Sequence, residues 1–241
     1  MNKASETKRF FQYVIPSVLS FALSGVYAIV DGFFVGNSLG DIGLSAVNIA
    51  YPIAAVIQAI GTGIGMGGAI YYSIHKAEKK EKEARMFTAG AIWLMLASTA
   101  ILTALFFFLS NPILRLLGAS GNLLALAEEY TVIIALGTGL QIIGTGLVPF
   151  IRNLGGSFYA MIAMVAGFIT NIILDYLFVW VWEQGVAGAA IATIIGQGVT
   201  LLIALAYLLQ KREFTLKIPF SKIAAVSASL FFSATISNSV L

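Results

Sequence analysis

The sequence contains no cysteine and few charged residues. Without cysteine among its 241 residues, the chain can form no disulfide, thiol nucleophile or zinc–thiolate site. Only 10% of the residues are charged, whereas 59% are apolar. A soluble domain carries about 25% charged residues, and so few charges could not cover a water-exposed surface of this size. The composition therefore excludes a disordered chain and most soluble enzymes, and it predicts an integral membrane protein.

The apolar residues form long continuous runs. A helix that crosses the hydrocarbon layer needs about 20 residues, whereas the strands of a membrane barrel alternate apolar and polar residues. The runs therefore predict an all-α fold with six transmembrane helices, at residues 10–36, 42–73, 86–109, 126–150, 158–182 and 186–209. We expect residues 1–217 to form this six-helix domain and residues 218–241 to contain part of a seventh span.

Lysine and arginine are distributed unevenly between the predicted loops. If the six spans alternate in direction, thirteen of the fourteen basic residues lie on one side, and only Arg115 lies on the other. Basic loops stay in the cytoplasm, so the pattern predicts a multi-pass protein of the plasma or inner membrane with a cytoplasmic N-terminus. The bilayer is then its expected partner. Nucleic-acid binding is not expected, because acidic residues interrupt the basic run at residues 78–83.

Two acidic residues, Asp31 and Asp175, fall inside predicted spans. An acid at the centre of a membrane helix costs about 2.5–3.5 kcal/mol and therefore suggests a functional site. Each residue also has a simpler interpretation. Asp31 is near enough to the end of its span to reach interfacial water, and Asp175 is placed to make a structural hydrogen bond between helices.

Three further observations favour a site around Asp175. Asn171 lies one helical turn earlier and therefore on the same face. Counted from the turn between the last two spans, Asp175 and Thr193 both lie about 10 Å deep. Asp31 lies at a similar level. Oxygen donors at one depth predict a site for Na⁺ or a proton, with Na⁺ at Asp175. No other metal and no cofactor is expected, and the absence of a nucleophile–base pair argues against an enzyme.

Other polar or aromatic residues inside the spans are weaker candidates. Gln58 and Gln141 are interpreted first as interhelical hydrogen-bonding groups and second as residues of a substrate cavity. Tyr27 and Tyr51 are interpreted first as packing or lipid-facing side chains and second as cavity residues.

The second predicted span contains a glycine-rich run at residues 61–68. It is not a dinucleotide-binding loop, because no strand precedes it. Gly61 and Gly65 are four residues apart and therefore predict a helix face that another helix can approach closely.

The order and spacing of several motifs resemble the multidrug and toxic compound extrusion (MATE) family. They are Val-Asp-Gly-Phe-Phe-Val-Gly at 30–36, Leu-Gly at 39–40, Gly-Leu-Ser-Ala-Val at 43–47 with Pro52, Asn-Ile-Ile-Leu-Asp at 171–175 and Gly-Val-Ala-Gly-Ala-Ala-Ile-Ala-Thr at 185–193. The resemblance extends over residues 8–215. It implies a secondary antiporter that exports cationic lipophilic compounds in exchange for Na⁺ or H⁺, with twelve spans in two six-helix lobes. By motif, the cation or proton site of the first lobe corresponds to Asp31, Asn171, Asp175 and Thr193.

The chain covers only one such lobe, which leaves three interpretations open. It is half of an antiporter, completed by a second lobe or by a homodimer, or it is a non-transporting membrane lobe that acts through association. The third, a lipid-linked-sugar flippase, is less favoured because the six spans contain no lysine or arginine.

Overall fold

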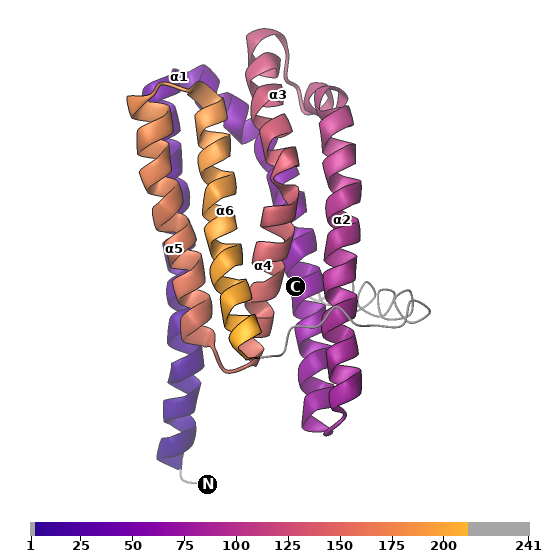
Figure 1. Ribbon diagram of the computed structural model, residues 1–241. Helices are drawn as coiled ribbons and strands as arrows, with labels where there is room; N and C mark the ends of the chain where they lie inside the picture. Colours follow the sequence, from indigo (N-terminus) through magenta and orange to yellow (C-terminus); the bar gives the residue numbers. More distant parts are fainter. Residues whose placement is uncertain (1–2, 212–241) are drawn as a thin grey trace.

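The computed structural model describes residues 3–211, and within this range the chain forms helices and no strand (Figure 1). The elements are α1 (Lys3–Ala77), α2 (Glu81–Leu116), α3 (Gly121–Leu136), α4 (Thr138–Asn153), α5 (Ser157–Asp175), the π-helix η1 (Tyr176–Val181) and α6 (Gly185–Gln210). The expected all-α membrane fold is confirmed. The predicted partial seventh span lies outside the described residues.

The long element α1 consists of two arms that meet at Gly40. This residue has φ 64° and ψ −166°, a backbone conformation that glycine adopts without steric cost. Figure 1 shows the first arm rising from the N-terminus and the second arm descending beside α2. The bend falls inside the predicted hairpin at residues 37–41, so α1 contains the first two predicted spans. We call the two ends of the bundle the Gly40 end and the Lys80 end.

The single span expected at residues 126–150 is wrong in shape. The chain there forms two 16-residue helices, α3 and α4, which meet at Gly137 with a bend of 57°. A Cβ atom on residue 137 would lie 2.3 Å from Cγ1 of Ile194, so glycine is required for α6 to pack at the bend. Within residues 3–211, four helices are individually long and apolar enough to cross a membrane, and the bent pair makes a fifth such unit. Division of α1 at Gly40 gives six.

Many large side chains on the outside of the bundle are apolar. Phe108 is 76% exposed and Ile29 is 74% exposed, as expected for residues in contact with lipid tails rather than water. The centre is filled by fully buried residues such as Met95, Ile142 and Phe150. An apolar exterior around a packed apolar centre agrees with a membrane environment.

The second arm of α1 packs very closely against α4. A Cβ atom on Gly65 would lie 2.0 Å from the carbonyl oxygen of Gly146, and one on Gly61 would lie 2.7 Å from that of Ile142. The two backbones therefore touch along one helical turn, which small residues make possible in membrane helix pairs. The Gly61 and Gly65 face predicted from the sequence lies at this contact.

Candidate functional site

Two acidic side chains from different helices meet inside the bundle. Asp31 comes from the first arm of α1 and Asp175 from the last residue of α5, and their carboxyl groups lie within hydrogen-bonding reach of each other. Asp175 is fully buried and its Oδ1 atom has no hydrogen-bond partner, whereas Asp31 is half-buried. Two carboxylates this close repel each other strongly in a low-dielectric interior. The pair therefore requires a shared proton or a bound cation.

Asn171 connects this acid pair to α6. When its amide is oriented to satisfy both neighbours, Nδ2 donates to Oδ2 of Asp175 at 2.9 Å and Oδ1 accepts from the backbone N–H of Thr193 at 3.1 Å. The amide also lies 3.5 Å from Oγ1 of Thr193. Asn171 is almost fully buried. The structure thus brings together all four residues that the sequence singled out.

Tyr130 on α3 is a fifth member of the site that sequence reasoning missed. Its side chain is buried, and its hydroxyl lies near the Thr193 side chain. A tyrosine close to a span end is typical of the aromatic belt at a membrane surface, so its position in the sequence carried no separate signal. Its role depends on the packing of α3 against α6, which becomes visible only in the fold.

Close packing of α5 and α6 holds the donors in place. A Cβ atom on Gly167 would lie 2.7 Å from the carbonyl oxygen of Gly196, and one on Gly196 would lie 3.0 Å from Cβ of Asn171. Directly after Asp175, the chain changes from an α-helix to the π-helix η1, in which the N–H of Trp182 donates to the carbonyl of Leu177 at 2.8 Å. Single π-helical turns are frequent at functional sites.

The chemistry of the site suits a small monovalent cation or a proton. Its donors are two carboxyl groups, one amide and two hydroxyl groups, all of which are hard oxygen or nitrogen groups. Within residues 3–211, no three histidine, cysteine, aspartate or glutamate side chains gather as a divalent metal would need.

The substrate-cavity candidates fall into different environments. Tyr51 is 65% exposed and Gln58 is also exposed, both on the second arm of α1. Gln141 is buried, and its Nε2 donates to the carbonyl oxygen of Ala54 at 3.3 Å. It thus bridges α4 and α1, as the first interpretation of this residue predicted. The side chain of Tyr27 lies outside the described residues.

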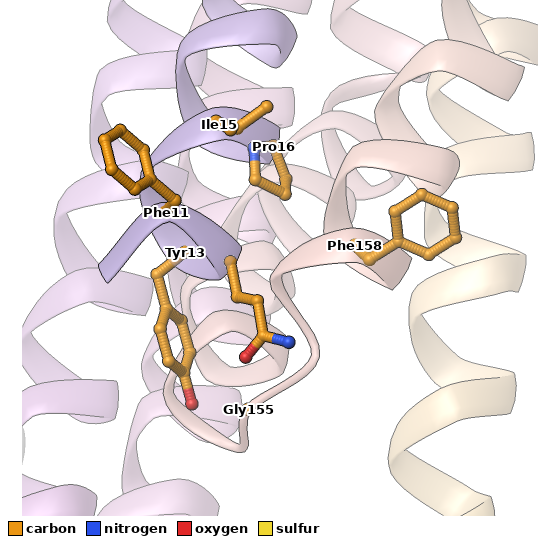
Figure 2. Close-up of a pocket in the computed structure, with 7 residues that line it drawn as sticks. Phe11, Tyr13, Ile15, Pro16, Gly155 and Phe158 are labelled. Carbon is orange, nitrogen blue, oxygen red and sulfur yellow. The ribbon is translucent and has the colours of Figure 1, made fainter. Parts of the chain in front are cut away.

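An open groove lies away from these residues, near the start of α1 (Figure 2). Its volume is about 660 Å³, and Phe11, Gln12, Tyr13, Ile15, Pro16, Gly155 and Phe158 line it. The walls are mainly aromatic and aliphatic, and the lining includes no acidic or basic side chain. The groove therefore offers no group that exchanges an ion, and the acid pair remains the candidate site.

Known proteins share both the sequence and the fold. The MatE family model matches residues 16–177. The multidrug export protein MepA of Staphylococcus saprophyticus is 30% identical over 212 residues, which are 88% of this chain and 47% of that protein. A crystal structure of MATE in the bent conformation superimposes with a TM-score of 0.84 at 26% identity, over 95% of this chain and 52% of that one. A MOP superfamily transporter from Pyrococcus furiosus gives a TM-score of 0.84 at 25% identity, over 95% of this chain and 51% of that one.

The chain spans about half the length of these relatives. The family match nevertheless covers most of the described helices, and the apolar helices agree with it. The chain is therefore a multi-pass membrane protein of the MatE family, a family of transporters rather than enzymes.

Proposed function

We propose that this chain forms one six-helix lobe of a secondary antiporter that exports cationic lipophilic compounds. Asp31, Asn171, Asp175 and Thr193 then hold the coupling ion, Na⁺ or H⁺, and Tyr130 completes the site. No cofactor is required, because the ion gradient supplies the free energy. The name of the staphylococcal relative, a multidrug export protein, supports the export of drugs.

The proposal rests on the pair of acids, Asp31 and Asp175, and on the buried oxygen of Asp175 that has no hydrogen-bond partner. A buried polar atom without a hydrogen bond costs about 1–3 kcal/mol, and Oδ1 of Asp175 is such an atom. A proton or Na⁺ between Asp31 and Asp175 would remove this cost and the repulsion together. Release of that ion would restore the cost of the unpartnered oxygen and the repulsion between the carboxylates. Because Asp31 lies on α1 and Asp175 on α5, ion binding would therefore affect how closely these two helices approach each other.

The exposed polar groups on the second arm of α1 support a cavity on that side of the lobe. Hydrocarbon cannot hydrogen-bond the Gln58 amide or the Tyr51 hydroxyl. Asn48 is also exposed on this arm. We infer that these side chains face a water-filled substrate cavity whose opposite wall is a second lobe or a second copy of this chain.

Transport by the purified chain tests this inference. Alternating access requires two bundles that move against each other around a central site. We expect the monomeric chain, reconstituted in liposomes with a fluorescent cationic dye, to bind the coupling ion but to show no gradient-driven dye efflux. Efflux that occurs only from a cross-linked dimer would support a homodimeric transporter. Efflux from a demonstrably monomeric chain would contradict the half-transporter proposal.

The predicted orientation can be tested at two exposed positions. Ser38 lies beside the Gly40 bend, and Lys80 lies in the connection between α1 and α2. Because the chain has no cysteine, an impermeant thiol reagent should label Ser38→Cys from outside intact cells. It should label Lys80→Cys only after permeabilisation. Labelling of position 80 from outside would reverse the proposed topology.

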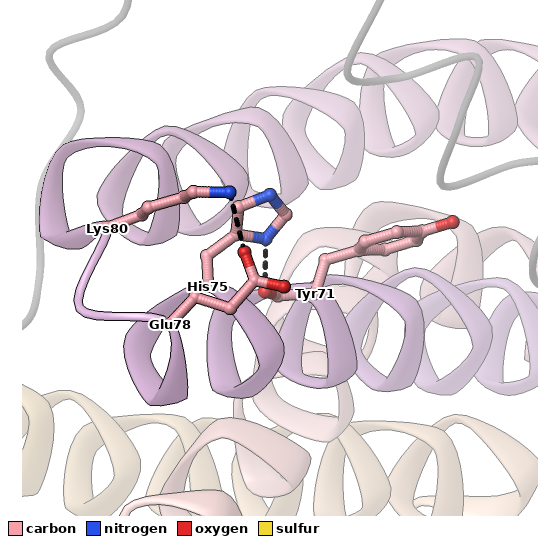
Figure 3. Close-up of polar contacts among 4 residues, drawn as sticks. All are labelled: Tyr71, His75, Glu78 and Lys80. Atoms are coloured by element: carbon pink, nitrogen blue, oxygen red, sulfur yellow. Dashed lines mark hydrogen bonds and ion pairs between the residues drawn. The ribbon is translucent and has the colours of Figure 1, made fainter.

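The surroundings of Lys80 indicate that this substitution leaves the fold intact. Figure 3 shows Lys80 paired with Glu78, with 2.7 Å between Nζ and Oε2. Both side chains are exposed, and the hydrogen bond from Lys80 lowers the pKa of the Glu78 carboxyl. In contrast, His75 is half-buried, and its Nδ1–H donates to the carbonyl oxygen of Tyr71 at 2.8 Å. Exposed ion pairs contribute little to stability, so the loss of Lys80 is tolerated better than a change at His75.

A further inference from the structure

The two elements that carry the acid pair meet a second time through aromatic rings. Phe34 follows Asp31 by three residues, and Trp180 follows Asp175 by five. Residues three apart lie on one face of an α-helix, and residues five apart are joined by one turn of a π-helix. The contact between Phe34 and Trp180 therefore lies about one turn beyond the contact between the two acids, toward the Gly40 end.

Four rings form this second contact, which we call the aromatic cluster: Phe33, Phe34, Tyr176 and Trp180. The indole of Trp180 stacks on Phe33, with 6.4 Å between centroids and 18° between planes. It meets Phe34 edge-to-face at 6.0 Å and 90°. Tyr176 also contacts Phe34, at 6.2 Å. Aromatic pairs favour these stacked and edge-to-face arrangements, so the cluster is an attractive contact between α1 and η1.

The cluster is not part of the packed core of the bundle. Phe33 is 55% exposed and Trp180 is 45% exposed, whereas Val179, between Tyr176 and Trp180, is buried and anchors η1 to the bundle. Val179, and not Trp180, is thus the buried residue of η1. What the ring adds is a contact with the first arm of α1 beside Asp31.

We propose that the aromatic cluster holds the Gly40 end of α1 against η1 and thereby sets the affinity of the acid pair for its ion. The inference rests on the proposed function of Asp31 and Asp175. Ion release leaves two repelling carboxylates, which favours separation of α1 from α5. The aromatic contacts oppose that separation, so they favour the closed arrangement that binds the ion. Phe34 and Trp180 act as positioning residues, because neither ring supplies an oxygen donor.

The ion affinity of the purified full chain tests this role. Binding is measured by calorimetry with NaCl against choline chloride at constant pH and ionic strength, and by proton uptake in Na⁺-free buffer. The titratable groups beside the site and the cluster are Asp31 on α1, Tyr130 on α3, Asp175 on α5 and Tyr176 on η1. We expect Trp180→Leu to weaken binding of the active ion about three- to tenfold, and Trp180→Phe to restore most of it.

Trp182 provides a matched control. It is two residues from Trp180 and 57% exposed, but its ring stacks on Phe178 of its own turn at 5.2 Å rather than on α1. Trp182→Leu should therefore bind the ion like the parent chain. If Trp180→Leu fails to fold, its size-exclusion elution profile will differ from that of the parent chain. Trp180→Phe then provides the test, because it retains an aromatic ring at this position.

A fluorescence measurement locates the effect. In a Trp93→Phe, Trp182→Phe background, Trp180 is the sole tryptophan of the chain, and its emission should shift as the ion binds. Asp175→Asn should abolish the shift. If the parent binds an ion that Asp175→Asn does not, and Trp180→Leu binds it with parental affinity, the role of the cluster is refuted while the proposed function stands. If the parent binds neither Na⁺ nor a proton at the acid pair, both fail.

Discussion

Substitution of Asp175 by asparagine should reduce affinity for the coupling ion by about 100-fold or more. Asp175 is fully buried, accepts a hydrogen bond from Asn171 and keeps one oxygen without a partner. Removal of one charge from a buried ionic interaction costs about 3–5 kcal/mol, and an amide cannot take up a proton as a carboxylate does. Calorimetric Na⁺ titration and proton uptake by the purified variant measure this loss.

Asp31→Asn is the matched comparison for this prediction. Asp31 is half-buried and reaches water more easily, so its substitution should weaken binding less than that of Asp175. Both variants should fold, because neutralising a buried acid removes a desolvation cost. If Asp175→Asn retains parental affinity for Na⁺ and protons, Asp175 has no part in coupling, and the proposed site must be abandoned.

The largest effect on stability is expected from Gly65→Ala. The added Cβ would lie 2.0 Å from the carbonyl oxygen of Gly146, and neither backbone can move aside without shifting a whole helix. Overpacking of this kind costs about 1–3 kcal/mol or more. The apparent melting temperature in detergent should fall by about 2–12 °C, as followed by helical circular dichroism.

Gly25→Ala is the control for the Gly65 variant. It lies on the first arm of α1, and a Cβ atom at this position would have no neighbour within 4 Å. Alanine is also a better helix former than glycine, so the melting temperature should stay the same or rise slightly. A Gly65→Ala chain that melts with the parent would show that α1 and α4 do not touch as described.

Asp31, Asn171, Asp175 and Thr193 could be selected as candidates from the sequence because their positions in the spans can be compared along the chain alone. An acidic residue inside an apolar run can be recognised from the sequence alone, and its depth in the membrane follows from the helical rise per residue. Tyr130 could not be found this way, because a tyrosine near a span end has an ordinary explanation at the membrane surface. The bend at Gly137 was missed for a related reason. Ile194, a residue from another helix, packs against Gly137 at the bend, and a continuous apolar run gives no sign of that neighbour.

The bend at Gly137 also bears on how this protein enters the bilayer during synthesis. Neither α3 nor α4 alone is long enough, since 16 residues rise about 24 Å against a layer of about 30 Å. The insertion machinery must therefore accept residues 121–153 as one hydrophobic unit. Ile194 emerges from the ribosome only after this unit is complete. The segment is therefore synthesised before α6, the helix that packs against Gly137 in the finished bundle.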